Sequence, residues 1–375
     1  METIIREESV FRIMDAMQGA KVCCIDYGNV KKGEKVLILT DTKADQRKTE
    51  VVACVCREVG AEVIIIVMEV RELPNQEPPR AVVETMKASD IVFANLFYTV
   101  SHTNARFEAM KAGTRYMGMY DSSIDALASE GARFPAEIIF AVTKKVAEQW
   151  WNGKTIHITC DKGTDIRAKI TDPANNLAGW EGCCCPLGEK PYLGKDKENF
   201  PEVGYRGLFG NFAGGFGVVG MWPNWTAEGV IYFDCAHTFP GRLKTPVKYT
   251  VEKGRVVKFE GDPEQVRFYE RILERFGPNA AHLAEFMIGL DPKARIYLDD
   301  PTHMEAHRHA GCLHCAIGQS VDAKRSVSPG IHLDNLIIEP TIKIDNQICV
   351  DRGKLMVYYE DPDILALLKK HNIKL

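Results

Sequence analysis

Short apolar runs alternate with helix-patterned segments along residues 1–153. The apolar runs KVLILT, EVIIIVM and DIVFANL stand at residues 35–40, 62–68 and 90–96. Residues 45–60, between the first two runs, have apolar positions at helical spacing and end in a glycine. This alternation predicts an α/β domain with a doubly wound parallel sheet. No turn within residues 1–153 carries the pattern GxGxxG, so a dinucleotide site in this domain is not supported.

Two helical segments complete this predicted domain. Residues 101–113, SHTNARFEAMKAG, predict a helix that is capped by Ser101 and ends at a glycine. Residues 135–153, PAEIIFAVTKKVAEQWWNG, predict a longer helix. We therefore expect residues 1–153 to form a Rossmann-like α/β domain.

Residues 154–375 follow a different pattern, in which short strands pair through turn residues. The predicted strands are KTIHITC and RAKIT around the turn DKGT, GVIYFDC, and paired strands within residues 246–261 and 340–359. One helical segment, residues 262–277, lies among them. This half is predicted to be an α+β catalytic domain rich in antiparallel strands.

Charge and composition narrow the function classes. A net charge of -4 over 375 residues gives no basis for binding nucleic acid or an anionic membrane. The first residues, METIIREESVFRIM, do not have the pattern of a signal sequence, and the longest apolar runs are too short to span a bilayer. We therefore expect a cytoplasmic protein whose twelve cysteines are reduced thiols.

Histidines gather in the last hundred residues. Six of the ten lie between residues 282 and 332: His282, His303, His307, His309, His314 and His332. His332 and Asp334 stand two apart in a strand-patterned segment, so their side chains face the same side. An imidazole beside a carboxylate suits a divalent cation, although surface ion pairs without metal have the same pattern.

Three further polar residues stand in apolar surroundings. His314, in GCLHCAIG, becomes a ligand only if the fold brings it against His332, and is otherwise a core histidine. His282 and Glu285 interrupt AAHLAEFMIG, where a lone buried carboxylate is costly unless it is paired or binds a cation. These two residues share a face in a helix but not in a strand, and the pattern leaves both structures open.

The cysteine motifs are open to several interpretations. Cys312 and Cys315 form a C-x-x-C pair, the spacing of a zinc half-site or a redox pair. The neighbouring His307 and His309 are too close together for an easy tetrahedron, and the pair lies outside the β-α-β half, where a thioredoxin-type motif belongs. We favour neither chemistry, and we expect the triple Cys183–Cys185 to be a turn of small residues.

Several motifs resemble a known superfamily. Residues 283–294, 311–318 and 330–355 (LAEFMIGLDPKA, GCLHCAIG and GIHLDNLIIEPTIKIDNQICVDRGKL) resemble the C-terminal half of the aminopeptidase T-type metallopeptidases. They are also similar to the related 2,5-dihydroxypyridine 5,6-dioxygenases. Further similarity covers SHTNARFEAMKAGTRYMGM, CDKGTDIRAKI and NFAGGFGVV, at residues 101–119, 160–170 and 211–219.

The resemblance implies a set of functional residues. Glu285 aligns with a metal-binding glutamate of the peptidases, and His332 and Asp334 align with an H-x-D pair that binds metal in both branches. His282 aligns with an iron-binding histidine of the dioxygenase branch, and His102 with a catalytic one. The implied metal ligands are His282, Glu285, His314, His332 and Asp334, and the implied catalytic residues are His102 and Glu285.

The chain also departs from both branches. Phe216 replaces the glutamate that the peptidases need for their two-metal site. Asn211 and Ala316 replace a histidine and a serine of the dioxygenase branch. We therefore expect a single divalent metal ion, with Fe2+ favoured and Zn2+, Mn2+ or Co2+ as alternatives.

Two chemistries fit such a centre. Histidine and carboxylate ligands on Fe2+ leave positions for O2 and substrate, with His102 as a base toward a hydroxylated ring. A metal-activated water with a carboxylate base instead hydrolyses a peptide or a small cyclic amide. We favour dioxygenase-like ring cleavage of a small cyclic or aromatic substrate, because His282 and His102 are present and the peptidase glutamate is absent. A metal-free small-molecule binding protein is the third alternative.

Two expectations concern the surroundings of the site. Phe216, Trp222 and Trp225 either line a pocket for a flat ligand or pack in the core or at an interface. The resemblance also implies a homodimer with its site between two domains.

Overall fold

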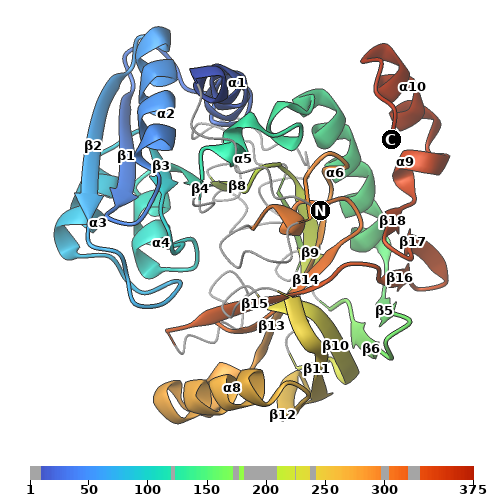
Figure 1. Cartoon of the computed structure of the whole chain (residues 1–375). Helices are drawn as coiled ribbons and strands as arrows, with labels where there is room; N and C mark the ends of the chain where they lie inside the picture. Colours follow the sequence, from blue (N-terminus) through green and yellow to red (C-terminus); the bar gives the residue numbers. More distant parts are fainter. Residues whose placement is uncertain are drawn as a thin grey trace.

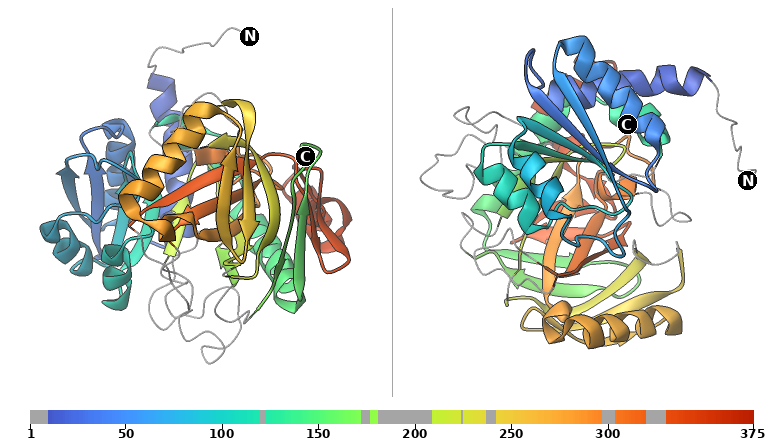
Figure 2. Two further views of the ribbon diagram at one scale, coloured as in Figure 1. Left: turned by 90° about the horizontal axis from the view of Figure 1, so that it is seen from below. Right: turned by 90° about the vertical axis from the view of Figure 1, so that its left-hand side faces the viewer.

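The computed structural model describes residues 10–119, 123–171, 177–180, 209–223, 225–236, 242–296, 304–319 and 330–375. These residues form two β-sheets, each accompanied by helices, with the first sheet at one end of the molecule (Figures 1 and 2). Cys183–Cys185 and His303 lie outside the described residues.

The first sheet has five parallel strands in the order β2-β1-β3-β4-β8. They are β1 (Lys35–Asp41), β2 (Glu62–Met68), β3 (Ile91–Asn95), β4 (Arg115–Met119) and β8 (Phe209–Phe212). Strands β1, β3 and β4 are buried on both faces, which explains their continuous apolar runs. The predicted parallel sheet is confirmed, but its fifth strand comes from beyond residue 153.

Helices α2 (Gln46–Val59), α3 (Arg80–Lys87) and α4 (Asn104–Lys111) follow β1, β2 and β3 along the chain. Asp45 caps α2 and Gly60 ends it in the left-handed conformation, as the spacing predicts. The predicted cap of α4 is wrong, because Thr103 and not Ser101 occupies that position. The Ser101 hydroxyl instead donates to Asn211 Oδ1 on β8 (3.2 Å), and so joins this loop to the fifth strand.

The remaining helical segments before residue 153 are α1 (Val10–Lys21), the π-helical turn η1 (Val22–Tyr27), α5 (Asp125–Ala128), η2 (Gly131–Arg133) and α6 (Ala136–Asn152). Helix α6 is predicted correctly but packs beside α9 (Val357–Glu360) and α10 (Pro362–Lys370) (Figure 1). Lys145 pairs with Asp363 (2.7 Å), and Glu137 pairs with Lys370 (2.7 Å). Helix α6 therefore links the N-terminal half to the C-terminal helices through these ion pairs.

The second sheet has thirteen strands in the order β18-β17-β16-β5-β6-β10-β15-β14-β13-β9-β7, with β11 and β12 branching from β10. Its paired strands are antiparallel and curl into a half-barrel (Figure 2). They are β5 (Thr155–Thr159), β6 (Asp165–Lys169), β7 (Leu177–Trp180), β9 (Val218–Met221), β10 (Glu228–Ala236), β11 (Arg242–Glu252), β12 (Arg255–Glu260), β13 (Leu283–Gly289), β14 (Leu313–Gly318), β15 (His332–Ile337), β16 (Thr341–Ile344), β17 (Gln347–Asp351) and β18 (Lys354–Leu355). The predicted antiparallel α+β half is confirmed.

Helical segments of the second half include α8 (Pro263–Phe276), η4 (Pro278–Ala281) and η5 (Met304–His307). Helix α8 matches its prediction, with Asp262 as its cap. The sequence predicts a strand through Tyr359, but the chain turns into α9, where the buried Tyr358 hydroxyl donates to Leu290 O (2.7 Å). Among the residues that the structure describes, no helix is long and apolar enough to cross a membrane.

The two sheets meet through a buried apolar cluster. Met287 on β13 and Trp222 pack in one cluster with Tyr116 and Phe209 of the parallel sheet. This contact brings the loop after β3 toward the face of β13, β14 and β15. His102, Glu285, His314, His332 and Asp334 come together at this junction, whereas the predicted ligand His282 does not join them.

Candidate metal centre

The strand register places four predicted ligands on one face of the second sheet. Glu285 on β13 stands opposite Ala316 on β14, which stands opposite Asp334 on β15. His314 and His332 lie two residues along their strands from Ala316 and Asp334, so they face the same side. The register alone therefore gathers two carboxylates and two imidazoles.

A β-bulge turns Glu285 toward this face. Leu283 pairs with Ile317 and Glu285 with Ala316, so Ala284 is the extra residue. Without a bulge, Leu283 and Glu285 would face the same side. The extra residue lets Leu283 enter the apolar core while Glu285 joins the polar cluster. The segment is thus a strand, which settles the alternative that the sequence leaves open.

The donor atoms lie at the separations that a metal ion requires. His332 Nε2 lies 3.3 Å from Asp334 Oδ1 and 3.5 Å from Glu285 Oε1, and His314 Nε2 lies 3.5 Å from Glu285 Oε1. Ligands at about 2.1 Å from a tetrahedral ion are about 3.4 Å apart. Two groups of three donors each lie within 4.8 Å: His102 with Glu285 and His332, and Glu285 with His314 and Asp334.

The hydrogen bonds of the cluster show which donor atoms remain for a metal ion. His332 Nδ1 lies 2.6 Å from the main-chain oxygen of Gln319, so Nδ1 carries the proton and Nε2 presents its lone pair. Among the described residues, the buried atoms His332 Nε2, Asp334 Oδ1 and Glu285 Oε2 have no hydrogen-bond partner. His332 Nε2 and Asp334 Oδ1 face each other at 3.3 Å, and two buried acceptors in this position require a cation or a proton between them.

The two carboxylates of the cluster favour a positive charge between them. Burial lowers the pKa of His332, but the carboxylates of Asp334 and Glu285 outweigh burial and raise that pKa well above its usual value. Burial raises the pKa of Glu285, but His332 and His314 outweigh it and hold that pKa well below its usual range. A proton on His332 or a divalent cation therefore stabilises the two carboxylates.

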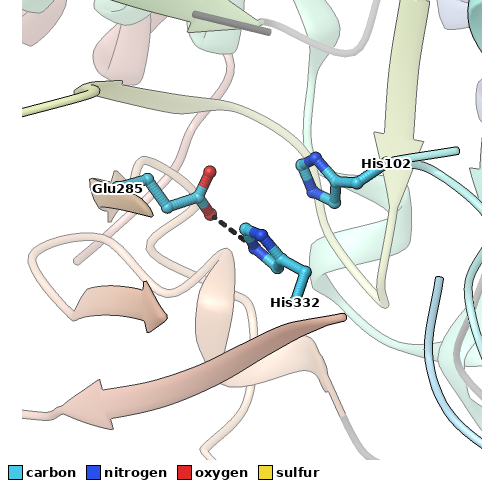
Figure 3. A group of neighbouring side chains, drawn as sticks. All are labelled: His102, Glu285 and His332. Carbon is cyan, nitrogen blue, oxygen red and sulfur yellow. Dashed lines mark ion pairs between the residues drawn. The ribbon is translucent and has the colours of Figure 1, made fainter. Parts of the chain in front are cut away.

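His102 reaches the cluster from the other half of the molecule. It lies in the loop between β3 and α4, at the carboxyl end of the parallel sheet, where open α/β sheets bind ligands. Its ring stacks on that of His332, with centroids 4.1 Å apart and planes at 15° (Figure 3). The predicted catalytic residue thus lies beside the predicted ligands.

The sequence pattern does not predict that His307 belongs near the candidate ligands, but its side chain packs against the donor cluster. Its ring stacks on that of His314, with centroids 4.3 Å apart and planes at 7°. His307 is the last residue of the 3-10 turn η5 and is 2% exposed. The HRH spacing gives no indication of this contact, because the contact depends on how the turn before β14 folds back.

The C-x-x-C pair does not form a site of its own. Cys312 and Cys315 are free and buried, and burial raises the pKa of both thiols well above the usual value. The two cysteines belong to separate apolar clusters, which accounts for them as core residues. His309 likewise does not join this pair, because its Nδ1 makes a hydrogen-bond contact of 2.6 Å with Ala294 O.

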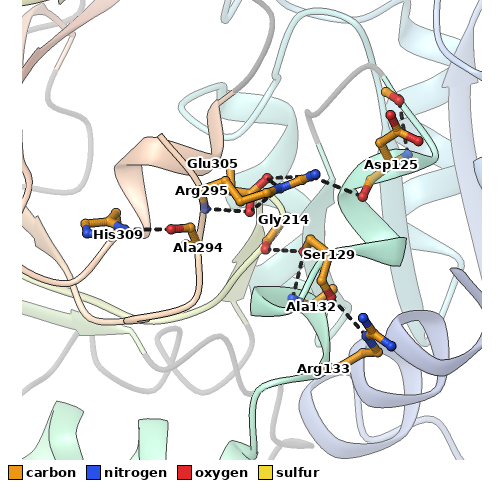
Figure 4. Close-up of polar contacts among 10 residues, drawn as sticks. Asp125, Ser129, Ala132, Arg133, Gly214, Ala294, Arg295, Glu305 and His309 are labelled. Carbon is orange, nitrogen blue, oxygen red and sulfur yellow. Dashed lines mark hydrogen bonds and ion pairs between the residues drawn. The ribbon is translucent and has the colours of Figure 1, made fainter. Parts of the chain in front are cut away.

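A polar network holds the glycine-rich loop between β8 and β9 (Figure 4). The Ser129 hydroxyl donates to Gly214 O (2.8 Å), and Glu305 accepts from the Arg295 N–H (2.6 Å) and pairs with its guanidinium. Gly214 has a φ of 73°, and a Cβ there would lie 2.6 Å from Glu305 Cδ. Close packing therefore requires this glycine.

Two of the three aromatic residues that the sequence offers for a ligand pocket are packing residues. Phe216 is fully buried, with its ring 3.5 Å from that of Tyr27. Trp222 is buried in the cluster that joins the sheets. Phe216 and Trp222 are therefore core residues, which is one of the two alternatives that the sequence leaves open. Trp225 is 38% exposed and contacts the His282 ring at 4.6 Å.

His282 stands outside both groups of donors found in the described ranges. It precedes β13 and is 1% exposed, and neither ring nitrogen has a hydrogen-bond partner in the part of the chain that the structure describes. Burial and the nearby Arg255 lower its pKa to about 4. The structure therefore does not bring this predicted ligand together with Glu285.

Replacing His282 with glutamine is expected to flatten the pH dependence of stability. The pKa of His282 falls from 6.5 to about 4 on folding, so between these values the unfolded chain takes up a proton that the folded protein does not. This costs the folded state roughly 2–3 kcal/mol as the pH falls through that window, and nothing above it. Urea unfolding of the metal-free protein at pH 7 and pH 4.5 measures the difference. An equal pH dependence in wild type and His282→Gln would contradict this account.

Part of the chain is similar in sequence to a known protein family. Residues 21–183, which include His102, match the family model described as NicX, 2,5-dihydroxypyridine 5,6-dioxygenase. No curated protein matches the chain.

Two solved structures share the fold. The 2,5-dihydroxypyridine dioxygenase from Pseudomonas putida has a TM-score of 0.68 at 16% identity, over 92% of this chain and 98% of that one. AmpT from Thermus thermophilus has a TM-score of 0.63 at 15% identity, over 92% of this chain and 99% of that one. The chain is thus similar in sequence to the dioxygenase family over residues 21–183, and it shares the fold of both solved structures over 92% of its length.

Proposed function

We propose that this chain is a mononuclear metal-dependent enzyme that cleaves the ring of a small hydroxylated heteroaromatic compound with O2. The observation that carries the proposal is the His102 ring stacked on His332, at the edge of a buried cluster of metal donors. Further support comes from the family match of the segment that contains His102.

The donor set fits one divalent ion. Glu285, His332 and Asp334 offer an imidazole and two carboxylates at metal-ligand separations, and His314 adds a second imidazole on the same face. Mixed histidine and carboxylate ligands suit Fe2+ with open coordination positions. When bound there, Fe2+ supplies the positions at which O2 and substrate are brought together, and no outside reductant is required if both oxygen atoms enter the product.

The protein's own residues prepare the substrate. A ring nitrogen of His102 takes the proton from a ring hydroxyl, because this imidazole lies beside the donor cluster and is held there by its backbone. His102 and His332 are both largely buried, which keeps competing water away from the deprotonated ring. The second sheet thus supplies the ligands, and the first sheet supplies the base.

A metal-dependent hydrolase is the second candidate, favoured by Glu285. Its Oε2 is buried and accepts no hydrogen bond, while Oε1 faces His314 and His332. A carboxylate in this position acts as a general base toward an attacking water. A peptide or a small cyclic amide is the substrate class for this alternative.

Oxygen uptake separates the two candidates. We expect anaerobically purified, Fe2+-loaded protein to consume O2 when it is given 2,5-dihydroxypyridine or a related dihydroxypyridine, with loss of the ring absorbance. The zinc-loaded protein is expected to consume none. Hydrolysis of peptides or cyclic amides by the Zn2+, Mn2+ or Co2+ form, without O2 uptake by the iron form, would overturn the dioxygenase proposal in favour of the hydrolase.

A further inference from the structure

We propose that Gln319 and Asn75 are positioning residues whose side-chain amides clamp the His102 peptide from two sides and hold its imidazole against His332. The inference rests on the proposed role of His102 as the base. Asn75 Oδ1 accepts from the His102 N–H (2.9 Å), and Gln319 Nε2 donates to the His102 carbonyl oxygen. The clamp joins the two halves, because Asn75 follows β2 and Gln319 follows β14.

Gln319 orients both rings of the stacked pair. Its side chain binds the His102 backbone, while its main-chain oxygen accepts from His332 Nδ1 (2.6 Å). Its own N–H donates to Ile331 O (2.7 Å), which fixes the residue next to β15. The two functions of Gln319 therefore reside in different atoms, and a substitution can remove one without the other.

Asn75 is held in an unusual conformation to make its contact. Its φ is 63°, in the left-handed region that residues other than glycine rarely adopt. Its N–H donates to Thr99 O (2.7 Å), which anchors the turn to the loop that carries His102. Asn75 and Gln319 are 3% and 2% exposed, so water does not compete with either amide.

The neighbours of His102 are fixed in other ways. Ser101 donates to Asn211 Oδ1, and Thr103 caps α4. The His102 peptide lies between these anchors, outside the helix and the sheet, and its N–H and carbonyl oxygen are bound by the two amides. Loss of either amide therefore removes one of the two side-chain contacts to the His102 peptide and leaves the donor cluster in place.

The test compares three substitutions with a control. Gln319→Ala removes the donor to His102 but retains the main-chain oxygen that binds His332. Gln319→Glu preserves size and places a carboxylate against a carbonyl oxygen, so a residue that only fills space would tolerate it. Asn75→Gly removes the acceptor without adding strain at a positive φ. Gln46→Ala is the control, because its amide also donates to main-chain oxygens, those of Asp41 and Ala44.

Two measurements decide the outcome. We expect all three variants to bind Zn2+ with wild-type stoichiometry, while nitrogen-15 NMR of the zinc-loaded protein shows the His102 ring signals shifted and the His332 signals retained. With 2,5-dihydroxypyridine and the iron form, we expect kcat to fall by ~10- to 100-fold, the effect of a misplaced catalytic group, with KM little changed. The control is expected to match wild type in both measurements.

Unchanged His102 signals in Gln319→Ala and Gln319→Glu would overturn the proposal, whatever the activity. Loss of zinc in these variants would also overturn it, because the side chain would then act on the metal ligands. If the wild-type protein does not act on the dihydroxypyridine, the dioxygenase function fails, and the NMR result still decides whether the amides position His102.

Discussion

Replacing His332 with alanine is expected to remove the metal from the purified protein and to abolish turnover. His332 Nε2 faces Asp334 Oδ1 at 3.3 Å and Glu285 Oε1 at 3.5 Å, so it is the donor shared by both carboxylates. Loss of a residue that merely orients a ligand lowers metal affinity by ~10- to 100-fold, and loss of this ligand is expected to exceed that range. Metal quantification by mass spectrometry and a titration of the metal-free protein measure the change.

The matched control is another histidine–aspartate pair of the same sheet. His157 on β5 lies 2.8 Å from Asp165 on β6, in an exposed pair that belongs to neither donor group. His157→Ala is therefore expected to retain both metal and activity. Retention of full metal by His332→Ala would show that the buried cluster is an ion-pair network of the protein alone.

Replacing His102 with glutamine is expected to preserve the metal and to lower kcat by ~10²- to 10⁴-fold, the contribution of a positioned general base. The glutamine side chain fills the site but does not take up a proton from the substrate. The measurements are the metal content and the rate of O2 uptake with 2,5-dihydroxypyridine as the substrate tested.

His102 also belongs to one of the donor groups, so its role has an alternative. If His102→Gln loses the metal together with the activity, His102 is a ligand and another residue must be the base. Because Glu285, His314, His332 and Asp334 provide four donors on one face of the second sheet without His102, we expect the metal to be retained.

The strand pattern correctly predicts how part of the candidate ligand set is arranged. His332 and Asp334 are two apart on a strand, so local geometry is sufficient to place them on one face. His314 requires one further step, the antiparallel pairing of β14 with β15, and the short separation of these strands in the sequence makes that pairing the simplest arrangement. The parallel sheet and the antiparallel half are likewise predictable, because both follow from period and turn residues.

The rest depends on long-range structure. The bulge at Ala284 decides which way Glu285 points, and one extra residue in a strand leaves no mark on the apolar pattern. His102 meets His332 only because Met287 and Trp222 pack against the parallel sheet. Strand β8 joins that sheet from beyond residue 153. No local sequence pattern predicts a strand pairing across such a separation.

The central claim is that the buried cluster binds one divalent metal ion, and metal content tests it most directly. The wild-type protein should be purified without oxygen and without added chelator, and its metals quantified against protein concentration. We predict close to one equivalent of a divalent metal per chain, with iron in excess of zinc, manganese and cobalt. A protein that contains no metal and binds none on titration would contradict the claim, and would leave a protonated His332 as the cation between Glu285 and Asp334.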